Sequence, residues 1–418
     1  MVQPHPKHKA ATSALPTHLQ LSREALAHNL NCVRTHAPKA NVVAMIKSNA
    51  YGHGMCLMAD ALAELGVRSF GVATLAEGVR LRRQRDKEEI LLFGGASWLG
   101  RADALVKHRL TPIITHLSEL EALLPFVGQG PFPVQIGLDT GMSRLGIYWE
   151  DAPQKALLPF IDFLKKYPQI ELQALATHFA KADECAATQL CEQQMARFTE
   201  GAEVFLAHGV APKRFSISNS SGILRGYGKY PKGLSAHQFR IKLDVRPGLM
   251  LYGIESRDEV KESPLQPLAC WRAPIVARKR VKQGRTVSYG GTHICQKDTE
   301  IAVIGAGYGD GVPRLLSDRG QVTIHGRTAP ILGRVCMDLL MVDVTDWIDT
   351  EHSEQVALGE SVTLLGAQTA ASTAVEWARL AQTIPYEIMT SVTSRVPRVW
   401  ADTHAPLSLD LIPLPHLE

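Results

Sequence analysis

The chain has 418 residues, of which 45% are hydrophobic and 21% charged, and this length is enough for two globular domains. Its formal net charge is only +4, with Lys and Arg dispersed among Asp and Glu, so nucleic acid is not an indicated partner. No run approaches the roughly 18 consecutive apolar residues that a membrane-spanning helix needs. We therefore expect no association with a membrane.

The N-terminal residues and the cysteines bear on the compartment. Residues 1–17 mix proline, histidine and lysine with small residues and lack the apolar stretch of a secretory signal, so we interpret them as a loose tail. The seven cysteines are odd in number and form no C-x-x-C pair, which fits neither a zinc cage nor a disulfide framework. We expect a cytoplasmic protein without a bound metal.

From about residue 18 to residue 258, short apolar or β-branched runs alternate with longer amphipathic segments, which is typical of βαβ units. Eight such runs occur. They begin near Val42, Ser69, Ile90, Thr111, Phe132, Leu172, Phe215 and Lys242. Eight parallel strands predict an α/β fold with an N-terminal (β/α)8 barrel.

The remaining residues, 259–418, have a different pattern. Short strands separated by turn residues are expected at 275–281, 300–304, 321–325, 329–332, 340–344 and 361–365, with one helical segment at 373–382. This pattern predicts a mostly antiparallel β domain at the C-terminus.

Residues suited to chemistry follow the barrel strands at their carboxyl ends, where sites in this architecture lie. These residues are Lys47, Arg144, His178, Asn219, Ser220, Arg246 and Gly248. Small polar residues and glycine expose backbone N–H groups to an anion. The sequence thus predicts a site with a phosphate-binding segment at this rim.

Lys47 closes the first apolar run and precedes a polar loop. Partial burial would lower its pKa and make the amine nucleophilic, although a lysine at a strand end more often extends to solvent. Residues 44–54, AMIKSNAYGHG, resemble the cofactor-lysine motif of alanine racemases. Residues 139–146, DTGMSRLG, resemble the family's second signature, and the resemblance extends over residues 18–400.

The resemblance implies that Lys47 holds pyridoxal 5'-phosphate as a Schiff base. It implies that Arg144 contacts the cofactor and the substrate carboxylate, and that the His178 ring lies near the cofactor, although a lone histidine is more often a core residue. The implied phosphate-binding residues are Tyr51, Asn219, Ser220, Gly248, Leu249 and Tyr386.

Arg246 is the residue that discriminates between mechanisms. In the family its counterpart faces the pyridine nitrogen of the cofactor. An arginine is always protonated and cannot accept a proton from that nitrogen, whereas a decarboxylase of the same fold would be expected to have a carboxylate there. The resemblance therefore favours racemisation.

Racemisation requires a proton acceptor on each face of the α-carbon. Residues 287–291, VSYGG, resemble the family segment with the catalytic tyrosine, here Tyr289, although an isolated Ser-Tyr-Gly is more often a turn. The resemblance also implies that Tyr308 narrows the entrance and that the Met337 backbone contacts the substrate. Because these β-domain segments complete the site of the opposite subunit in the family, a homodimer is implied. The glycine-rich run 305–311 fails the dinucleotide-binding fingerprint at Asp310.

One position departs from the family pattern. Many alanine racemases have a carbamylated lysine two residues before the aspartate of the second signature, where this chain has Gly137. Arg144 must then be oriented by another group. We expect an alanine racemase that supplies D-alanine for peptidoglycan. The alternatives are a broader racemase acting on serine, lysine or arginine, a fold-related decarboxylase, and a non-catalytic carrier of the cofactor.

Overall fold

The computed structural model describes residues 16–128, 130–231, 233–234, 240–260, 262–348, 352–366 and 369–402. Most of the predicted tail, residues 1–15, lies outside this description. The chain forms two compact units. The first unit is Glu24–Gln266, and the second combines the described residues of 16–23 with those of 267–402.

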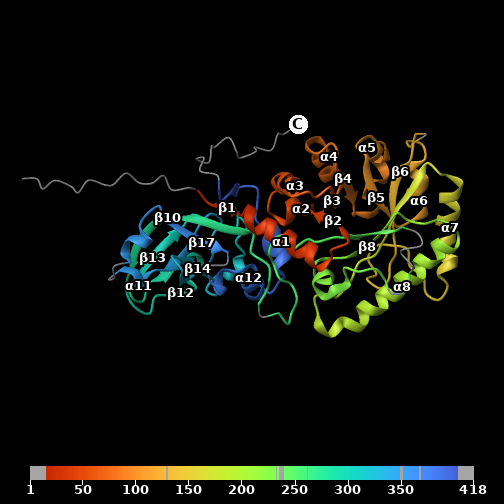
Figure 1. The fold of residues 1–418 in the computed structure, drawn as a ribbon. Helices are drawn as coiled ribbons and strands as arrows, with labels where there is room; N and C mark the ends of the chain where they lie inside the picture. Colours follow the sequence, from red (N-terminus) through yellow and green to blue (C-terminus); the bar gives the residue numbers. More distant parts are fainter. Residues whose placement is uncertain are drawn as a thin grey trace, which may run out of the picture. The chain divides into compact units, whose positions relative to one another are not determined.

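The first unit is a closed barrel of eight parallel strands (Figure 1), as the sequence predicts. In chain order the strands are β2 (Ala40–Met45), β3 (Ser69–Val72), β4 (Glu89–Leu92), β5 (Leu110–Ile114), β6 (Phe132–Gly137), β7 (Ile170–Ala176), β8 (Arg214–Ser218) and β9 (Lys242–Val245). Pairing of Val42 with Val245 joins the last strand to the first. Because every strand is parallel, all eight carboxyl ends lie at one rim.

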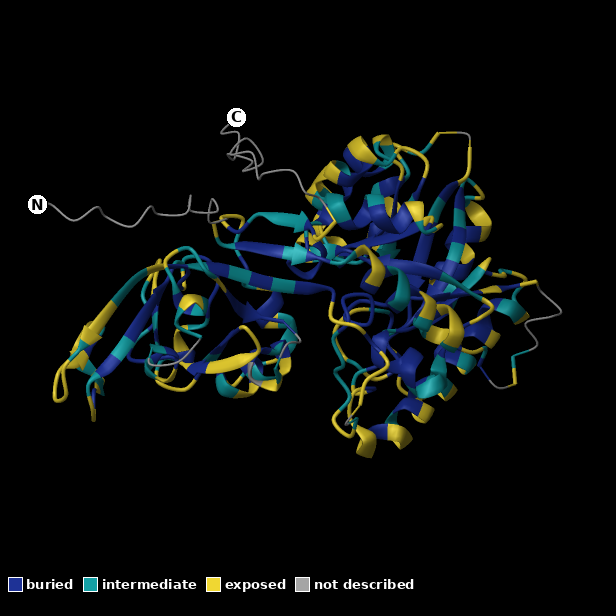
Figure 2. Ribbon diagram, turned by 60° about the vertical axis from the view of Figure 1, so that its left-hand side comes forward, coloured by how far each residue is buried: buried dark blue, intermediate teal, exposed yellow. Residues whose placement is uncertain are grey.

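The helices of this unit have apolar faces that are buried. They are α1 (Arg23–His36), α3 (Met55–Glu64), α4 (Leu75–Gln84), α5 (Ala102–Lys107), α6 (Leu117–Leu123), α7 (Pro153–Lys166) and α8 (Thr188–Ala207). In α7, for example, Leu157, Phe160, Ile161 and Leu164 are buried at helical spacing. Figure 2 shows buried strands and helices with exposed outer faces.

The amino-terminal ends of the barrel strands contain a buried ion cluster. Arg214 donates to Glu89 Oε2 at 2.8 Å, and its Nε lies 3.3 Å from Asp244 Oδ2. Asn41 donates to Asp244 Oδ1 at 3.0 Å. Burial raises the pKa of Asp244 to about 6, although Arg214 acts against the rise. Polar groups at this end of such a barrel serve stability.

The second unit is mostly β, as predicted. Its main sheet has the order β15-β14-β17-β10-β1-β18, and β13 pairs with β10 and β16. The strands are β1 (His18–Leu21), β10 (Ala269–Val281), β13 (Thr299–Ile304), β14 (Gln321–Ile324), β15 (Arg327–Pro330), β16 (Leu340–Asp343), β17 (Ser361–Leu365) and β18 (Arg398–Trp400), with β11 (Thr286–Val287) and β12 (His293–Ile294) as a separate ribbon.

Two features of this unit differ from the sequence analysis. Residues 18–21, which begin the predicted barrel segment, form β1 and pair with Cys270 of β10 and Val399 of β18 through Gln20. A four-residue alternating run does not specify which sheet it joins. The helical part also has more than the one predicted segment: α12 (Ala374–Leu380) is accompanied by the short helices α11 (Thr345–Ile348) and α13 (Pro385–Thr390), which are too short for periodicity to reveal.

None of the helices in the described part of the chain combines the length and apolar character that crossing a bilayer requires.

Candidate active site

Lys47 stands at the start of an unusual turn at the end of β2. In α2 (Lys47–Tyr51), the four residues after the lysine have φ values of 50–54°. Each left-handed L-residue is disfavoured by about 1–2 kcal/mol, and such strain persists where neighbouring groups hold it, often at functional sites. Glu77 of α4 accepts the Ser48 N–H at 2.7 Å, and Asn49 Oδ1 accepts the Met55 N–H at 2.9 Å.

The charges around Lys47 favour its neutral amine. Burial lowers the pKa of Lys47, and the neighbouring cations Arg144 and Arg246 lower it further, while Glu77 acts in the opposite direction. A lysine that loses its proton more readily is a better nucleophile and a better base. The structure therefore gives Lys47 the electrostatic setting of a reactive amine.

Arg246, just after β9, is held by three acceptors at the barrel rim. It donates to Ser216 Oγ at 2.6 Å, to the Ile217 carbonyl at 3.0 Å and to the Thr177 carbonyl. Burial lowers the pKa of Arg246 to about 10, so the guanidinium is still charged at neutral pH. Its position is fixed, and it can donate hydrogen bonds but cannot accept a proton.

His178 follows β7, and its Nδ1 lies 3.4 Å from Arg246 Nη2. Burial lowers the pKa of His178 to about 3, with Arg246, Arg144 and Lys47 contributing in that order. The imidazole is therefore neutral at physiological pH. A neutral Nδ1 can accept a hydrogen bond from the guanidinium, which leaves the ring proton on Nε2.

We expect His178 to reduce stability in acid. A histidine in the unfolded chain titrates near 6.5. Below that pH the unfolded state binds a proton that the folded state takes up only near pH 3. The free energy of unfolding is therefore lower by about 2 kcal/mol at pH 5. Urea unfolding at pH 7 and pH 5 should show a smaller drop for His178→Gln than for wild type. His208→Gln, at the end of α8, is the control. Equal drops in all three proteins would contradict an imidazole that stays neutral in the folded state.

Arg144 lies on a loop whose own side chain and backbone groups are hydrogen-bonded to one another. Asp139 Oδ1 accepts the N–H groups of Gly141, Met142 and Ser143 at 3.0–3.1 Å. The Arg144 side chain is exposed and makes no hydrogen bond or ion pair with the residues that the structure describes. A Cβ at Gly137 would lie 3.2 Å from Ile113 Cδ1, so Ile113 packs against the position of the family lysine.

The loops after β8 and β9 form a polar cradle around the Ser220 hydroxyl. Ser220 Oγ accepts the N–H groups of Gly248 and Met250 at 2.9 and 3.2 Å, and Asn219 caps the short turn α9 (Ser220–Gly222) at 3.0 Å. Gly248 must lack a side chain, because a Cβ would come within 2.6 Å of the Tyr51 hydroxyl. Leu249 is buried beside it in sequence. The predicted residues Tyr51, Ser220 and Gly248 are thus brought together.

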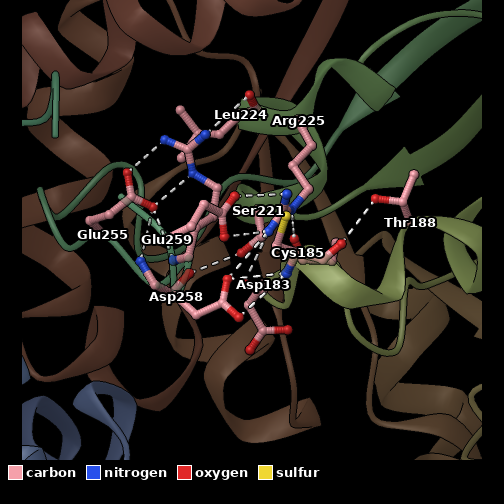
Figure 3. A network of polar contacts seen from close by, with 12 residues as sticks. Asp183, Cys185, Thr188, Ser221, Leu224, Arg225, Glu255, Asp258 and Glu259 are labelled. Carbon is pink, nitrogen blue, oxygen red and sulfur yellow. Dashed lines mark hydrogen bonds and ion pairs between the residues drawn. The ribbon is translucent and has the colours of Figure 1, made fainter. Parts of the chain in front are cut away.

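A polar network fixes the outer part of the loop that follows His178 (Figure 3). Arg225 donates to the carbonyl of Ala182 at 2.6 Å and pairs with Glu259 at 2.8 Å. Asp258 accepts the Cys185 N–H at 3.1 Å. The segment after the barrel strands therefore holds this loop in place.

Tyr289, Tyr308 and Met337 come from neighbouring segments of the second unit. Ser288 Oγ donates to the Arg334 carbonyl at 2.6 Å, and the Tyr308 N–H donates to the Cys336 carbonyl at 3.0 Å. All three side chains are exposed, by 72%, 42% and 53% respectively. Tyr386, predicted to bind phosphate, is half-buried on α13 of the same unit.

Sequence reasoning missed several residues that hold the site. Glu77 is recognisable as the acidic member of a capping box with Thr74, but that signal does not reveal its bond to Ser48. Ser216 and Gln194 gave no signal, because a single polar residue in a buried strand or helix has no distinctive pattern.

Comparison with known proteins identifies the class and then the family. Residues 21–256 match the family described as "Alanine racemase, N-terminal domain", and residues 268–400 match "Alanine racemase, C-terminal domain". The barrel and the β unit together therefore define an enzyme of the isomerase class. The chain belongs to the alanine racemase family.

Individual relatives agree along nearly the whole chain. Alanine racemases of Geobacter sulfurreducens and Carboxydothermus hydrogenoformans are 34% and 35% identical, over 92% of this chain and 97% and 99% of theirs. The solved alanine racemase of Bacillus anthracis with bound L-Ala-P is 28% identical, with a TM-score of 0.81 over 94% of this chain and 97% of that one. That of Bartonella henselae, with covalently bound pyridoxal phosphate, is 27% identical, with a TM-score of 0.77 over 92% and 99%.

Proposed function

We propose that this protein binds pyridoxal 5'-phosphate on Lys47 and interconverts L- and D-alanine. The observation that carries the proposal is the half-buried amine of Lys47 beside two arginines at the barrel rim, where its pKa is lowered. The donor set fits this cofactor: an amine for its aldehyde carbon, and the Tyr51, Ser220 and Gly248 cradle for its phosphate. Asn219, Leu249 and Tyr386 complete the proposed phosphate set.

Bound pyridoxal phosphate would withdraw electrons from the substrate and acidify the proton on its α-carbon. Arg246 would limit that withdrawal, because a guanidinium only donates hydrogen bonds and cannot stabilise a protonated ring nitrogen, and an unprotonated ring withdraws electrons less strongly. His178 stays neutral and accepts from Arg246. Arg144, exposed at the rim, would pair with the substrate carboxylate. These residues favour inversion over decarboxylation or transamination.

Inversion needs two bases on opposite faces of the α-carbon, because one base returns the proton to the side from which it came. In the proposal, Lys47 removes the proton of the D isomer and Tyr289 that of the L isomer.

The proposal includes a homodimer in which each site takes Tyr289, Tyr308 and Met337 from the partner chain. Its support is that these three side chains are exposed on adjacent segments of the β unit. Exposed aromatic groups of this kind are typical of surfaces that a second protein covers. The enzyme would act in the cytoplasm and supply D-alanine for peptidoglycan.

Gly137 favours a second candidate, a racemase of broader specificity acting on serine, lysine or arginine. Without the family lysine, Arg144 lacks one constraint, and Tyr308 and Tyr386 would be left to limit the size of the substrate.

The test is to incubate the purified protein and pyridoxal phosphate with each of a panel of L-amino acids. Chiral chromatography then measures the two isomers, and released carbon dioxide is assayed in parallel. We expect L-alanine to approach equal amounts of both isomers, with the highest kcat/KM of the panel and no release of carbon dioxide. A higher kcat/KM on lysine or arginine would overturn alanine as the substrate. Release of carbon dioxide would overturn racemisation.

A further inference from the structure

One side-chain amide joins the loops that carry Arg144 and His178. Gln194, on α8 (Figure 1), accepts the Ala180 N–H at 3.0 Å through Oε1. Its Nε2 donates to the His178 carbonyl at 2.9 Å and to Thr140 Oγ1 at 3.3 Å. Thr140 Oγ1 also lies 2.7 Å from Thr177 Oγ1. One residue thus bridges the loop after β6 and the loop after β7.

Gln194 has the one amide side chain among the buried residues of its helix. The other buried residues of α8 are Cys191, Phe198, Gly201, Ala202, Val204 and Phe205, none of which contributes a polar side chain comparable to an amide. Gln194 has no exposed surface, and a buried amide without partners is disfavoured by about 1–3 kcal/mol. Its three hydrogen bonds avoid that penalty only while both loops keep their present positions.

Backbone hydrogen bonds tie the Arg144 loop to the barrel at its base, where the Leu138 N–H donates to the Ala176 carbonyl at 2.7 Å. Among the described residues, the Asp139 carboxylate accepts from N–H groups of its own loop, and Gly137 provides no side chain. A Cβ on Gly141 would lie 3.7 Å from Gln194 Cγ, so the glutamine also packs beneath this loop.

We propose that Gln194 is a positioning residue: it fixes the loop that carries Arg144 to the strand end that carries His178. The proposal rests on the proposed function for its catalytic consequence. Its structural consequence, the order of the loop at residues 139–147, can be measured in the protein without substrate.

Gln194→Met removes the amide and keeps a side chain of similar length. Phe198→Leu is the matched control, because Phe198 is buried on the same helix and packs edge-on against Phe215 with ring centroids 5.4 Å apart. We expect hydrogen exchange at residues 139–147 to become roughly 10-fold faster in Gln194→Met but not in Phe198→Leu. KM for alanine should rise about 10-fold, with kcat changing less than about 3-fold.

Gln194→Glu supplies a readout that a general loss of packing would not give. Ionised glutamate cannot donate to the His178 carbonyl, whereas the protonated acid can, and burial raises the pKa of a carboxyl group. The kcat/KM of Gln194→Glu relative to wild type should therefore rise as pH falls from about 8 to about 5.5.

Three outcomes decide the matter. The positioning role would be overturned if hydrogen exchange at residues 139–147 were no faster in Gln194→Met than in Phe198→Leu. It would also be overturned if the kcat/KM of Gln194→Glu kept a constant ratio to wild type across the pH range. Wild-type protein that racemises no amino acid would overturn the proposed function instead, and the exchange measurement would still judge Gln194.

Discussion

Replacement of Lys47 by alanine is expected to abolish both the visible absorbance of bound cofactor and all racemisation. The physical reason is specific to this lysine: burial and two neighbouring arginines lower its pKa, and a left-handed turn, held by Glu77, fixes the backbone beside it. Without the amine there is no group to bond covalently to the cofactor and no base on that face of the substrate. Absorbance spectroscopy and borohydride reduction followed by peptide mapping would measure the loss.

The control for this change is Lys181→Ala. Lys181 lies on the loop after His178 and is paired with Glu184 at the surface, so its removal should leave cofactor absorbance and turnover near the wild-type values. A reducible adduct in the Lys47→Ala protein, mapped to a different lysine, would refute the assignment of Lys47.

Substitution of Tyr289 by phenylalanine is expected to decrease racemisation by about 10²–10⁴-fold with the cofactor still bound, because a positioned acid–base group contributes that much. The tyrosine is 72% exposed on the β unit, so loss of its hydroxyl should not affect folding. Exchange of the α-proton of D-alanine with deuterated water should continue, since Lys47 remains. Inversion, in contrast, should be slowed by the full factor of about 10²–10⁴.

Tyr148→Phe is the matched control, because Tyr148 is also an exposed tyrosine and has no proposed role in the reaction. Turnover of Tyr289→Phe within a few-fold of Tyr148→Phe would exclude the two-base mechanism.

The architecture was predictable from the sequence because each barrel strand is a short apolar run followed by an amphipathic segment. The run beginning near Val42 became β2, and that beginning near Lys242 became β9, which closes the barrel against it. Strand β1 was not predictable in the same way. Its four residues alternate polar and apolar side chains, a pattern that suits either unit, and the pairing of Gln20 with Cys270 and Val399 decides its sheet.

The residues of the candidate site that stand in a sequence motif were predictable. Those that depend on contacts between distant segments of the chain were not. Lys47, Arg144 and Arg246 stand in recognisable segments, and the structure places their charges within mutual influence. Gln194 lies 54 positions from Thr140, and no local pattern links them. The low pKa of His178 likewise depends on burial and on cations from three other segments.

The central claim is that each site uses Lys47 of one chain and Tyr289 of its partner. Lys47→Ala and Tyr289→Phe chains, each inactive alone, can be co-expressed with different tags and their racemisation of alanine measured. Random pairing of two such chains leaves about a quarter of all sites with both intact residues, so we predict about a quarter of wild-type activity. No activity in purified mixed dimers would contradict the shared site.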